Sequence, residues 1–456
     1  MMSTADVVVV GGGIAGLTAA WELARAGRRV EVLEAGDRTG GLLRAAEVAG
    51  ATLDVGAESF AIRTSGVADL IADAALPLDV VAPAPEGAHL VWRGRFGRTR
   101  RAPLPRRALL GLPAEPGAAD VARIIGRRGV RRALAEASLP RDAAAAAEPT
   151  LADLAAERFG PRVADLLVEP LCRSVYSQPA ASVRLSTLHP ALWRAFTDHG
   201  SLTAAVAGLA PASRAGSAVR GIAGGMWRLA AELRRAAEAA GAVVRTGAPV
   251  RAIRPGAAAT EVVLDGEVLT ADHVLLATGA TAAAALLGVD AAAPAPVRLT
   301  TVALSTPDLA SRPVGTGVIV APGVPVAAKA LTHVDAKWGW AAAALPAGTH
   351  VVRLSARDAA VPVPGEPAAL ARELRRLTGA PVRPAEIDDV IRTDWTDAVV
   401  PPSLRATLSD AARSSGVVLL GAVAAGTGLA SVIPHARAAA RDLLSTTPSE
   451  GAPHVR

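Results

Sequence analysis

Cysteine is nearly absent from this 456-residue chain, which contains only Cys172. A single cysteine excludes an internal disulfide and a cluster of cysteine metal ligands. We interpret Cys172 as a small buried hydrophobic side chain rather than a nucleophile. The eight histidines show no spacing typical of metal ligands, so the sequence predicts no metal site.

Aromatic residues make up only 3% of the chain, and they do not alternate with basic residues. Because affinity for single strands depends on aromatic stacking, we predict no nucleic-acid binding despite the net charge of +6. Long apolar runs are also missing. The most apolar segment, Val417 to Ile433, is interrupted by glycines and is too short and irregular to span a membrane. No cationic apolar leader opens the chain, so we expect a cytoplasmic protein, and a peripheral membrane contact stays open.

Asparagine is absent, and lysine occurs only at positions 329 and 337, whereas alanine, arginine, glycine and proline are abundant. This pattern is typical of a GC-rich genome. We therefore interpret most alanine-rich stretches as ordinary helix and core residues without a specific function. With 51% hydrophobic residues the chain can bury a large core, and its length suits two interleaved domains.

Residues 6–34 predict a strand, a helix and a second strand in sequence. Val7 to Val10 form an uninterrupted apolar run, which is typical of a strand covered on both faces. Apolar residues then recur at helical spacing from Leu17 to Arg25, and Arg29 to Leu33 form the second strand. The turn between the first strand and the helix consists of Gly11, Gly12, Gly13, Ile14, Ala15 and Gly16.

Each glycine of this turn has a physical role in dinucleotide binding. Gly11 permits the tight turn, Gly13 lets the backbone approach a pyrophosphate, and Gly16 lets the helix pack closely on the strand. The helix N-terminus offers unpaired N–H groups to the phosphates. Glu34, at the end of the second strand, is placed to accept hydrogen bonds from ribose hydroxyls.

The segments after Glu34 extend this pattern. Ala35, Arg38, Gly40, Gly41 and Leu42 follow it, and Gly56-Ala57-Glu58-Ser59 come after a short strand-like segment. Together they resemble the extended motif of the flavin amine oxidase superfamily. The resemblance implies an FAD cofactor, with Arg38 and the two glycines along the phosphates and the isoalloxazine, and with Gly56 to Ser59 beside the ring.

A distant segment completes the resemblance. Gly416 to Gly421 predict a strand and a turn, and a helix extends from Leu429 through Leu444. A second helix N-terminus at the flavin would stabilise negative charge on the reduced ring. The further cofactor-binding residues that the resemblance implies are Val250, Thr278, Trp395, Gly421, Ala422, Thr427, Gly428 and Leu429.

We therefore predict an α/β fold with a discontinuous Rossmann-like FAD-binding domain, into which a substrate domain of helices and antiparallel sheet is inserted. The predicted FAD-binding segments are 1–80, 216–296 and 391–456. Segment 81–215 is predicted to form the helical part of the substrate domain, and segment 297–390 its sheet. No internal repeat is evident.

Three stretches resemble the protoporphyrinogen/coproporphyrinogen III oxidase family, and they lie in 151–176, 185–202 and 315–338. The first contains Glu169-Pro170-Leu171 and ends in Arg173, Ser174 and Tyr176, which the resemblance implies as substrate-binding residues. Gly56 to Phe60 resembles the Gram-positive branch of the family, which acts on coproporphyrinogen III.

The resemblance implies oxidation of coproporphyrinogen III to coproporphyrin III in haem biosynthesis, with O₂ as acceptor and H₂O₂ as product. The flavin N5 would accept hydride, and no side chain is assigned as a catalytic base. Protoporphyrinogen IX oxidase, another flavin enzyme such as an amine oxidase or a desaturase, and a non-catalytic flavin- or porphyrin-binding relative remain alternatives. Segments 174–179 and 401–407 depart from the family pattern and support the last of these.

Arginine is concentrated in two stretches, with seven residues from Arg93 to Arg107 and five from Arg123 to Arg132. Arginine suits bidentate contacts with carboxylates such as the four propionates of coproporphyrinogen. The alternative is that these residues are solvated or contact a membrane surface. Contact with a ferrochelatase and the oligomeric state stay open.

Overall fold

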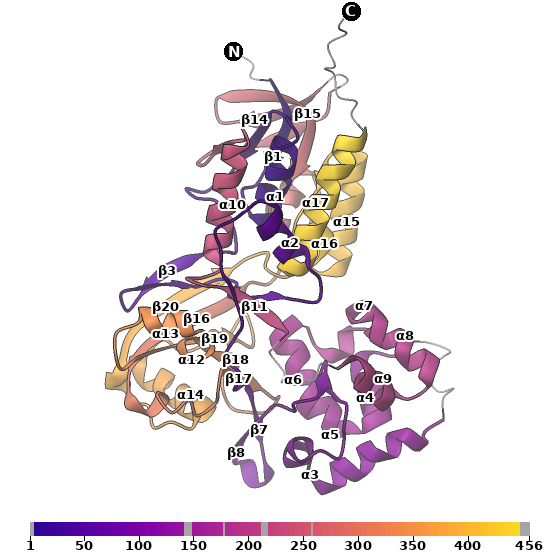
Figure 1. Cartoon of the computed structure of the whole chain (residues 1–456), viewed down its shortest axis with the longest axis vertical. Helices are drawn as coiled ribbons and strands as arrows, with labels where there is room; N and C mark the ends of the chain where they lie inside the picture. The colour runs from indigo at the N-terminus through magenta and orange to yellow at the C-terminus, as the bar shows by residue number, and fades with distance from the viewer. Residues whose placement is uncertain (1–3, 141–147, 177, 211–217, 257–258, 447–456) are drawn as a thin grey trace, which may run out of the picture.

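The computed structural model describes residues 4–140, 148–176, 178–210, 218–256 and 259–446. Figure 1 shows an upper part built around one sheet, and a lower part in which a second sheet lies beside a bundle of helices. Among the described residues, no helix combines the length and apolarity needed to cross a bilayer.

The upper sheet has a parallel core. In spatial order its parallel strands are β12 (Val243–Arg245), β2 (Val30–Leu33), β1 (Thr4–Val10), β15 (Glu267–Leu276) and β21 (Val418–Leu419). Strands β14 (Thr260–Leu264) and β13 (Ala252–Arg254) extend the first half of β15 as an antiparallel meander. The sheet therefore joins three segments that are each separated by more than a hundred residues of the chain.

Helices cover both faces of this sheet, as a parallel sheet requires. Val7 and Val9 face one core and Val8 and Val10 the other, and all four are buried. The first core includes α1 (Ile14–Ala24), α2 (Gly66–Asp73), α10 (Trp227–Ala239) and α17 (Leu429–Thr446). The second includes α11 (Ala280–Leu286), α15 (Pro402–Ser414) and α16 (Ala422–Ala425).

The second sheet has seven strands, and all neighbours are antiparallel except β17 and β7. Their spatial order is β20 (Ile387–Trp395), β16 (Val297–Ser305), β19 (Thr349–Ala356), β18 (Ala328–His333), β17 (Gly317–Val320), β7 (His89–Arg93) and β8 (Thr99–Pro103). Helix α14 (Pro367–Thr378) packs on one face through Leu370 and Leu374.

The opposite face of the second sheet carries the hairpin of β3 (Ala45–Val48) and β4 (Ala51–Asp54), together with α12 (Val334–Lys337) and α13 (Gly339–Ala344). Trp338 is the largest side chain of this contact and is buried. A small sheet of β5 (Phe60–Ala61), β11 (Val219–Ile222) and β6 (Val80–Val81) lies nearby. The chain thus passes repeatedly between the upper and lower parts.

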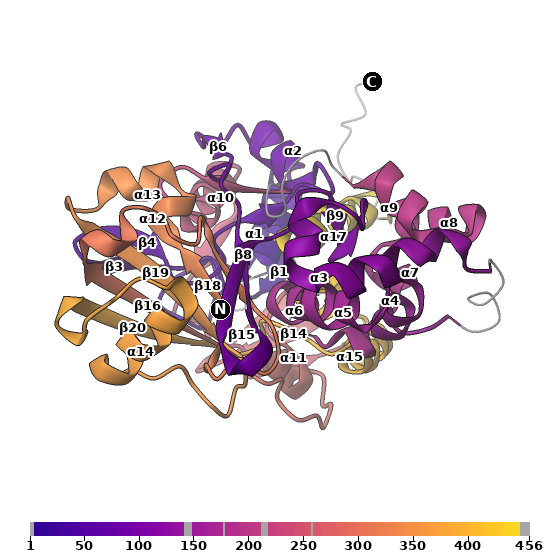
Figure 2. The same cartoon turned by 90° about the horizontal axis from the view of Figure 1, so that it is seen from below.

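The helical bundle lies beside β7 and β17, as the view from below shows (Figure 2). Its elements are α3 (Ala119–Leu134), α4 (Leu151–Phe159), α5 (Pro161–Val163), α6 (Glu169–Leu171), the π-helical segment η5 (Cys172–Tyr176), α7 (Leu185–Leu188), α8 (Pro190–His199) and α9 (Leu202–Leu209). Cys172 is buried here, and burial raises the pKa of its thiol to about 12, so its structural interpretation stands.

The predicted fold class is confirmed, because a parallel sheet between helices is combined with an antiparallel sheet and a helical bundle. The boundary predicted at 296/297 coincides with the first residue of β16. The boundaries at 80/81 and 390/391 fall inside β6 and β20, because these strands continue across them. The boundary at 215/216 lies outside the described residues. The assignment of the segments to domains stays a prediction.

A buried ion pair stabilises the helical bundle. Arg158 is 2% exposed and Glu136 is fully buried, and their side chains approach to 2.7 Å. Glu136 also accepts hydrogen bonds from the amides of Leu202 and Thr203 and from the Ser201 hydroxyl. The pair therefore ties the end of α3 to α4 and to the start of α9.

We predict that Glu136→Ala lowers the free energy of unfolding by about 3–5 kcal/mol, because it leaves the buried guanidinium of Arg158 without its counter-charge. The measurement is urea denaturation followed by circular dichroism. Glu238→Ala is the control, since it removes an exposed pair with Arg234 worth about 1 kcal/mol or less. Equal losses for the two variants would contradict this prediction.

Candidate functional site

The glycine turn after β1 packs backbone directly on backbone. Gly11 has φ of 108°, and a Cβ there would lie 2.6 Å from the carbonyl oxygen of Ala277. A Cβ at Gly16 would lie 2.0 Å from the carbonyl oxygen of Gly11. Neither position admits a side chain, so both glycines are required for β1, β15 and α1 to meet at this distance.

The next glycines leave one side of the turn open. A Cβ added at Gly13 would meet nothing within 4 Å, and one added at Gly41 would touch Gly13 at 3.5 Å. Gly40 donates its N–H to the Gly12 carbonyl oxygen at 2.9 Å. The structure therefore brings the Gly40-Gly41 pair against the turn, beside the N-terminus of α1.

Glu34 holds the loop that follows β2. Its carboxylate accepts hydrogen bonds from the N–H groups of Gly12 and Gly36, both at 2.8 Å. The Glu34 carbonyl accepts from Ala248 N–H at 2.9 Å, which brings the segment that contains Val250 close to the loop. Ala35 and Arg38 are exposed here.

The C-terminal segment that contains β21 and α16 also lies beside the glycine turn. Leu420 N–H donates to the Leu276 carbonyl at 2.8 Å, which aligns β21 with the end of β15. A Cβ at Gly421 would lie 3.7 Å from that of Ala15, and Gly421 precedes Ala422 at the start of α16. Gly428, with φ of 103°, faces open space beside the exposed Thr427 and the first residue of α17, Leu429.

A buried donor at this site has no protein partner. The hydroxyl of Thr278 is buried without a hydrogen bond among the described residues, and the Thr278 amide nitrogen lies beside Gly11. A ligand that enters the open side at Gly13 would supply the missing partner. The open backbone at Gly13 and the Thr278 hydroxyl are suited to the polar part of a dinucleotide. The exposed Leu42 side chain is suited to contact an apolar ring of the same ligand.

Leu42, Gly56 and Trp395 come together at a second close approach. A Cβ at Gly56 would lie 2.0 Å from the Leu42 carbonyl oxygen and 3.1 Å from the indole of Trp395. The Trp395 N–H donates to the Val55 carbonyl at 3.0 Å, and Ala57 N–H donates to the Leu42 carbonyl at 3.1 Å. Three of the predicted cofactor-binding residues, Leu42, Gly56 and Trp395, therefore lie side by side.

Glu58, next to this approach, is a structural anchor. Its carboxylate pairs with Lys337 at 2.6 Å and with Arg353 at 2.8 Å, and Arg353 also donates to the Gly56 carbonyl at 2.8 Å. Burial alone would raise the pKa of Glu58, but the two cations lower it to about 2. Glu58 is therefore ionised at neutral pH. It is tied to β19 of the second sheet and to α12, which packs on that sheet.

Asp54 anchors the same segment to α10. It accepts the backbone N–H groups of Met226 and Trp227 at 2.7 and 3.0 Å. Burial nevertheless raises its pKa to about 6. The sequence placed Asp54 and Lys337 only within stretches that resemble the family and gave neither a role, and it did not single out Arg353.

Of the predicted substrate-binding residues, Arg173 and Ser174 lie where η5 meets the second sheet. Arg173 is 44% exposed and forms an ion pair with Glu169, and the Ser174 hydroxyl donates to the Lys329 carbonyl at 3.1 Å. Tyr176 is the last residue of η5, and its side chain lies outside the described residues. The contacts of the described residues are all within the protein and do not test the substrate roles, which stay predictions.

The arginine-rich stretches have structural contacts. Arg101 donates to the carbonyls of Leu377, Arg375 and Arg376 at the C-terminus of α14. Arg132 caps α4 in the same way through the carbonyl of Arg158 at 3.1 Å. Both stretches lie in the lower part, away from the glycine turn of β1 (Figure 1).

The structure groups two histidines that sequence spacing did not connect. Asp335 Oδ2 lies 2.8 Å from His350 Nδ1 and 3.4 Å from His333 Nε2, and Asp335 Oδ1 accepts from Val351 N–H. Burial opposes ionisation of Asp335, but these hydrogen bonds hold its pKa below the ordinary value. The group joins α12 to β18 and β19, and it was missed because strand register brings position 350 to position 333.

Comparison with known proteins gives one family match and several relatives. The model of the flavin containing amine oxidoreductase family matches residues 14–444. The coproporphyrinogen III oxidase of Mycobacterium leprae is 34% identical over 369 residues, which cover 78% of each chain.

Solved structures share the fold. A putative protoporphyrinogen oxidase from Exiguobacterium sp. superposes with a TM-score of 0.82 at 22% identity, over 98% of this chain and all of the other. Putrescine oxidase superposes with a TM-score of 0.68 at 17% identity, again over 98% of this chain and all of the other.

We predict that Gly16→Ala yields protein with below about one tenth of the wild-type flavin content, because the new methyl group would push α1 away from the turn. The measurement is the flavin absorbance of the purified protein relative to its protein absorbance. Gly208→Ala is the control, since a Cβ at Gly208 meets nothing within 4 Å. Normal flavin content in Gly16→Ala would refute the assignment of the turn.

Glu58 and Asp54 give opposite pH dependences of stability. Because the pKa of Glu58 is 4.5 when unperturbed and about 2 in the fold, its stabilising contribution is complete above pH 4.5 and is lost as pH falls towards 2. The raised pKa of Asp54 gives a contribution that is complete below 3.8 and is lost as pH rises through about 6.

We therefore expect Glu58→Gln to flatten a plot of Tm against pH below pH 4.5. We expect Asp54→Asn to flatten the same plot between pH 3.8 and about 6. Differential scanning fluorimetry of the wild type and both variants measures this. A Glu58→Gln variant with an unchanged acid limb would show that the carboxylate is not ion-paired in solution.

Proposed function

This chain belongs to the flavin containing amine oxidoreductase family, and on that basis we propose that it oxidises coproporphyrinogen III to coproporphyrin III. It is a flavin-dependent oxidoreductase with FAD as its cofactor. In the proposed reaction O₂ is the electron acceptor and H₂O₂ the second product, and the reaction belongs to haem biosynthesis.

The observation that carries the proposal is the similarity to the Mycobacterium leprae coproporphyrinogen III oxidase over more than three quarters of both chains. That similarity extends far beyond any dinucleotide-binding segment. It therefore includes much of the second sheet and helical bundle, where a substrate would be selected.

We assign the FAD contacts to residues at the open side of the glycine turn and around the approach of Leu42, Gly56 and Trp395. The α1 N-terminus from Gly11 to Gly16 and the loop of Ala35, Arg38, Gly40 and Gly41 would hold the phosphates, with Glu34 and Val250 at the adenosine. Thr278 would donate its unpartnered hydroxyl. Residues at the flavin ring would be Leu42, Gly56, Ala57, Glu58, Ser59, Trp395, Gly421, Ala422, Thr427, Gly428 and Leu429.

The bound flavin would supply the hydride-accepting chemistry, and the side chains here are suited to binding rather than proton transfer. Glu58 is ionised and held by two cations, so it is not a base poised for a proton. Asp54 is engaged by two backbone amides at the α10 N-terminus. These residues hold the segment from Asp54 to Glu58 in place. In the proposed reaction the second sheet and the helical bundle would orient the macrocycle.

Protoporphyrinogen IX oxidation is the second candidate, because a putative protoporphyrinogen oxidase has the higher TM-score of the two solved structures compared. An amine oxidase is the third candidate, because the matched family is that of the flavin containing amine oxidoreductases and the fold is shared with putrescine oxidase. A non-catalytic flavin- or porphyrin-binding role is the remaining alternative. The two porphyrinogens differ in carboxylate number, so charge near the substrate is the feature that separates them.

We expect the purified protein to be yellow and to convert coproporphyrinogen III into fluorescent coproporphyrin III with stoichiometric H₂O₂. The measurement couples porphyrin fluorescence to a peroxide assay under air, with flavin-free Gly16→Ala protein as the control for autoxidation. A flavin-loaded protein whose rate equals that of the control would reject the proposal. Binding of porphyrin without turnover would favour the non-catalytic alternative.

A further inference from the structure

Two histidines and one aspartate meet at the end of β18. His333 is the last residue of β18, Asp335 lies in the first turn of α12, and His350 lies on β19. Each of the three offers one ligand atom, and these atoms lie within 4.8 Å of one another. Three elements of the fold therefore converge through side chains of the types that bind metal ions.

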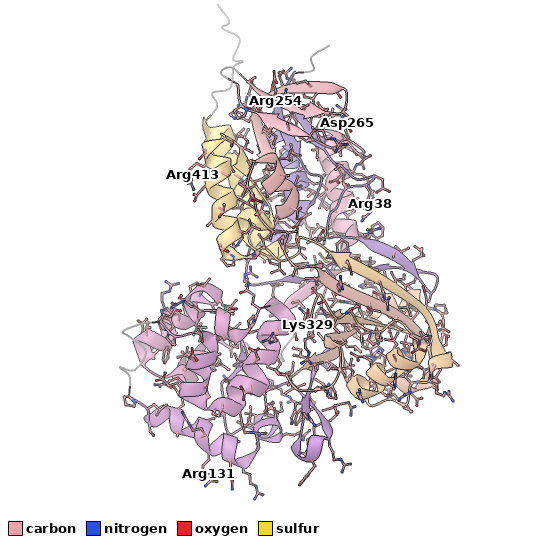
Figure 3. The ribbon with its side chains drawn as sticks, turned by 180° about the vertical axis from the view of Figure 1, so that it is seen from behind. Arg38, Arg131, Arg254, Asp265, Lys329 and Arg413 are labelled. Carbon is pink, nitrogen blue, oxygen red and sulfur yellow. The ribbon has the colours of Figure 1, made fainter. Side chains whose placement is uncertain are left out.

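This group is separate from the proposed flavin site. Near its other end β18 carries Lys329, where the second sheet meets the helical bundle (Figure 3), and His333 is four residues further along the strand. Successive side chains of a strand alternate between its two faces, so His350 and Arg353 of β19 point to opposite faces. Arg353 is the residue that pairs with Glu58. His350 therefore points away from the contacts that anchor the proposed flavin site.

His333 is buried without a well-formed hydrogen bond. Its side chain is 1% exposed, and neither Nδ1 nor Nε2 of its ring has a hydrogen-bond partner in the part of the chain that the structure describes. Nε2 lies 3.4 Å from Asp335 Oδ2, which is longer than the roughly 2.7–3.2 Å of a good hydrogen bond. Its cross-strand neighbour on β19 is the apolar Val352. Buried polar groups almost always have a partner, so an ion at Nε2 would supply a missing one.

Asp335 is held through one carboxylate oxygen and offers the other. Its Oδ1 accepts the N–H of Val351 at 2.8 Å, as outer hydrogen bonds orient the ligands of metal sites. Its Oδ2 lies 2.8 Å from His350 Nδ1 and is the oxygen nearest His333. The free oxygen is therefore aimed at both histidines by a backbone contact.

The separations suit a metal of the zinc type. Bonds of about 2.0–2.2 Å from zinc to nitrogen and oxygen separate tetrahedral ligand atoms by roughly 3.4 Å, and Asp335 Oδ2 and His333 Nε2 are 3.4 Å apart. Ligation through His350 Nδ1 requires the tautomer that carries the proton on Nε2. That Nε2 is buried without a hydrogen-bond partner among the described residues, so the proton has a place on the ring and displaces no existing contact.

We propose that His333, Asp335 and His350 bind one divalent transition-metal ion of the zinc type, which fastens α12 to β18 and β19. Two imidazole nitrogens favour zinc and its neighbours over Mg²⁺ and Ca²⁺, which prefer oxygen ligands. His350 is 12% exposed, so a water molecule can complete the coordination. The inference goes beyond the proposed function and holds whichever substrate the flavin oxidises.

Spacing along the chain predicted no metal site, because strand register brings these ligands together. Position 333 pairs with position 352 across β18 and β19, which sets His350 diagonally opposite His333 on the same face. The ion would also support the cluster at the proposed flavin site, since α12 ends in Lys337, which pairs with Glu58 at 2.6 Å.

Metal content of the flavin-loaded protein tests the site. The protein is treated with EDTA, freed of the chelator, dialysed against Zn²⁺ in the presence of excess Mg²⁺, and analysed by mass spectrometry of its metals. We expect about one zinc per chain in the wild type and less than about 0.2 in His333→Gln and Asp335→Asn. Asp335→Asn keeps an oxygen for the Val351 N–H and removes only the charged ligand.

His199→Gln is the matched control, since it removes an exposed histidine at the end of α8. It should retain about one zinc per chain. Circular dichroism and flavin absorbance verify that each variant is folded and loaded. A wild type with less than about 0.2 zinc per chain would overturn the proposal. Equal zinc in the wild type, His333→Gln and Asp335→Asn would overturn it too, because the zinc would then be bound elsewhere.

A spectroscopic measurement on the wild type does not depend on whether the variants fold. Co²⁺ occupies zinc sites and absorbs in the red part of the visible spectrum, where oxidised flavin does not. We expect bands that saturate at one cobalt per chain and disappear on addition of one equivalent of Zn²⁺. A zinc concentration of about 100 times Kd should raise the Tm of the metal-free flavoprotein by about 3 °C, and Mg²⁺ should not. Absence of the cobalt bands, or an equal Tm shift with Mg²⁺, would reject the site.

Discussion

The structure depends on places where backbone contacts backbone with no room for a Cβ. At Gly16 and Gly56 an added Cβ would lie 2.0 Å from a carbonyl oxygen. The first contact sets α1 at the end of β1 and aims its free N–H groups at the open side of the turn. The second sets the ring-side segment against Leu42 and Trp395. The proposed flavin site is formed by these approaches more than by individual side-chain contacts.

A buried ionic cluster then joins the proposed flavin site to the part of the protein that would select the substrate. Glu58 follows Gly56 by two residues, and Arg353 and Lys337 belong to the second sheet and the helix beside it. Removing two cations and a carboxylate from water is costly unless they pair with good geometry. The cluster therefore fixes where β19 and α12 lie relative to Gly56.

The sequence predicted a dinucleotide-binding turn and the elements around it from local patterns, whereas the flavin cofactor was implied by the resemblance to the flavin amine oxidase superfamily. Glycines at fixed spacing and an apolar strand followed by helical periodicity carry that information along one continuous segment. It did not predict the contacts of Glu58 with Arg353 or the grouping of His333 with His350, because strand register decides both. Lys337 was visible in the sequence only as part of the stretch 315–338 that resembles the porphyrinogen oxidase family, and no contact followed from it.

The central claim is that this flavoenzyme removes hydride from a porphyrinogen rather than from an amine. Anaerobic mixing of the yellow protein with coproporphyrinogen III or putrescine, followed by flavin absorbance, tests it most directly. We predict loss of the flavin absorbance with coproporphyrinogen, appearance of coproporphyrin absorbance, and no change with putrescine. Flavin reduction by the amine, with no reduction by the porphyrinogen, would contradict the claim.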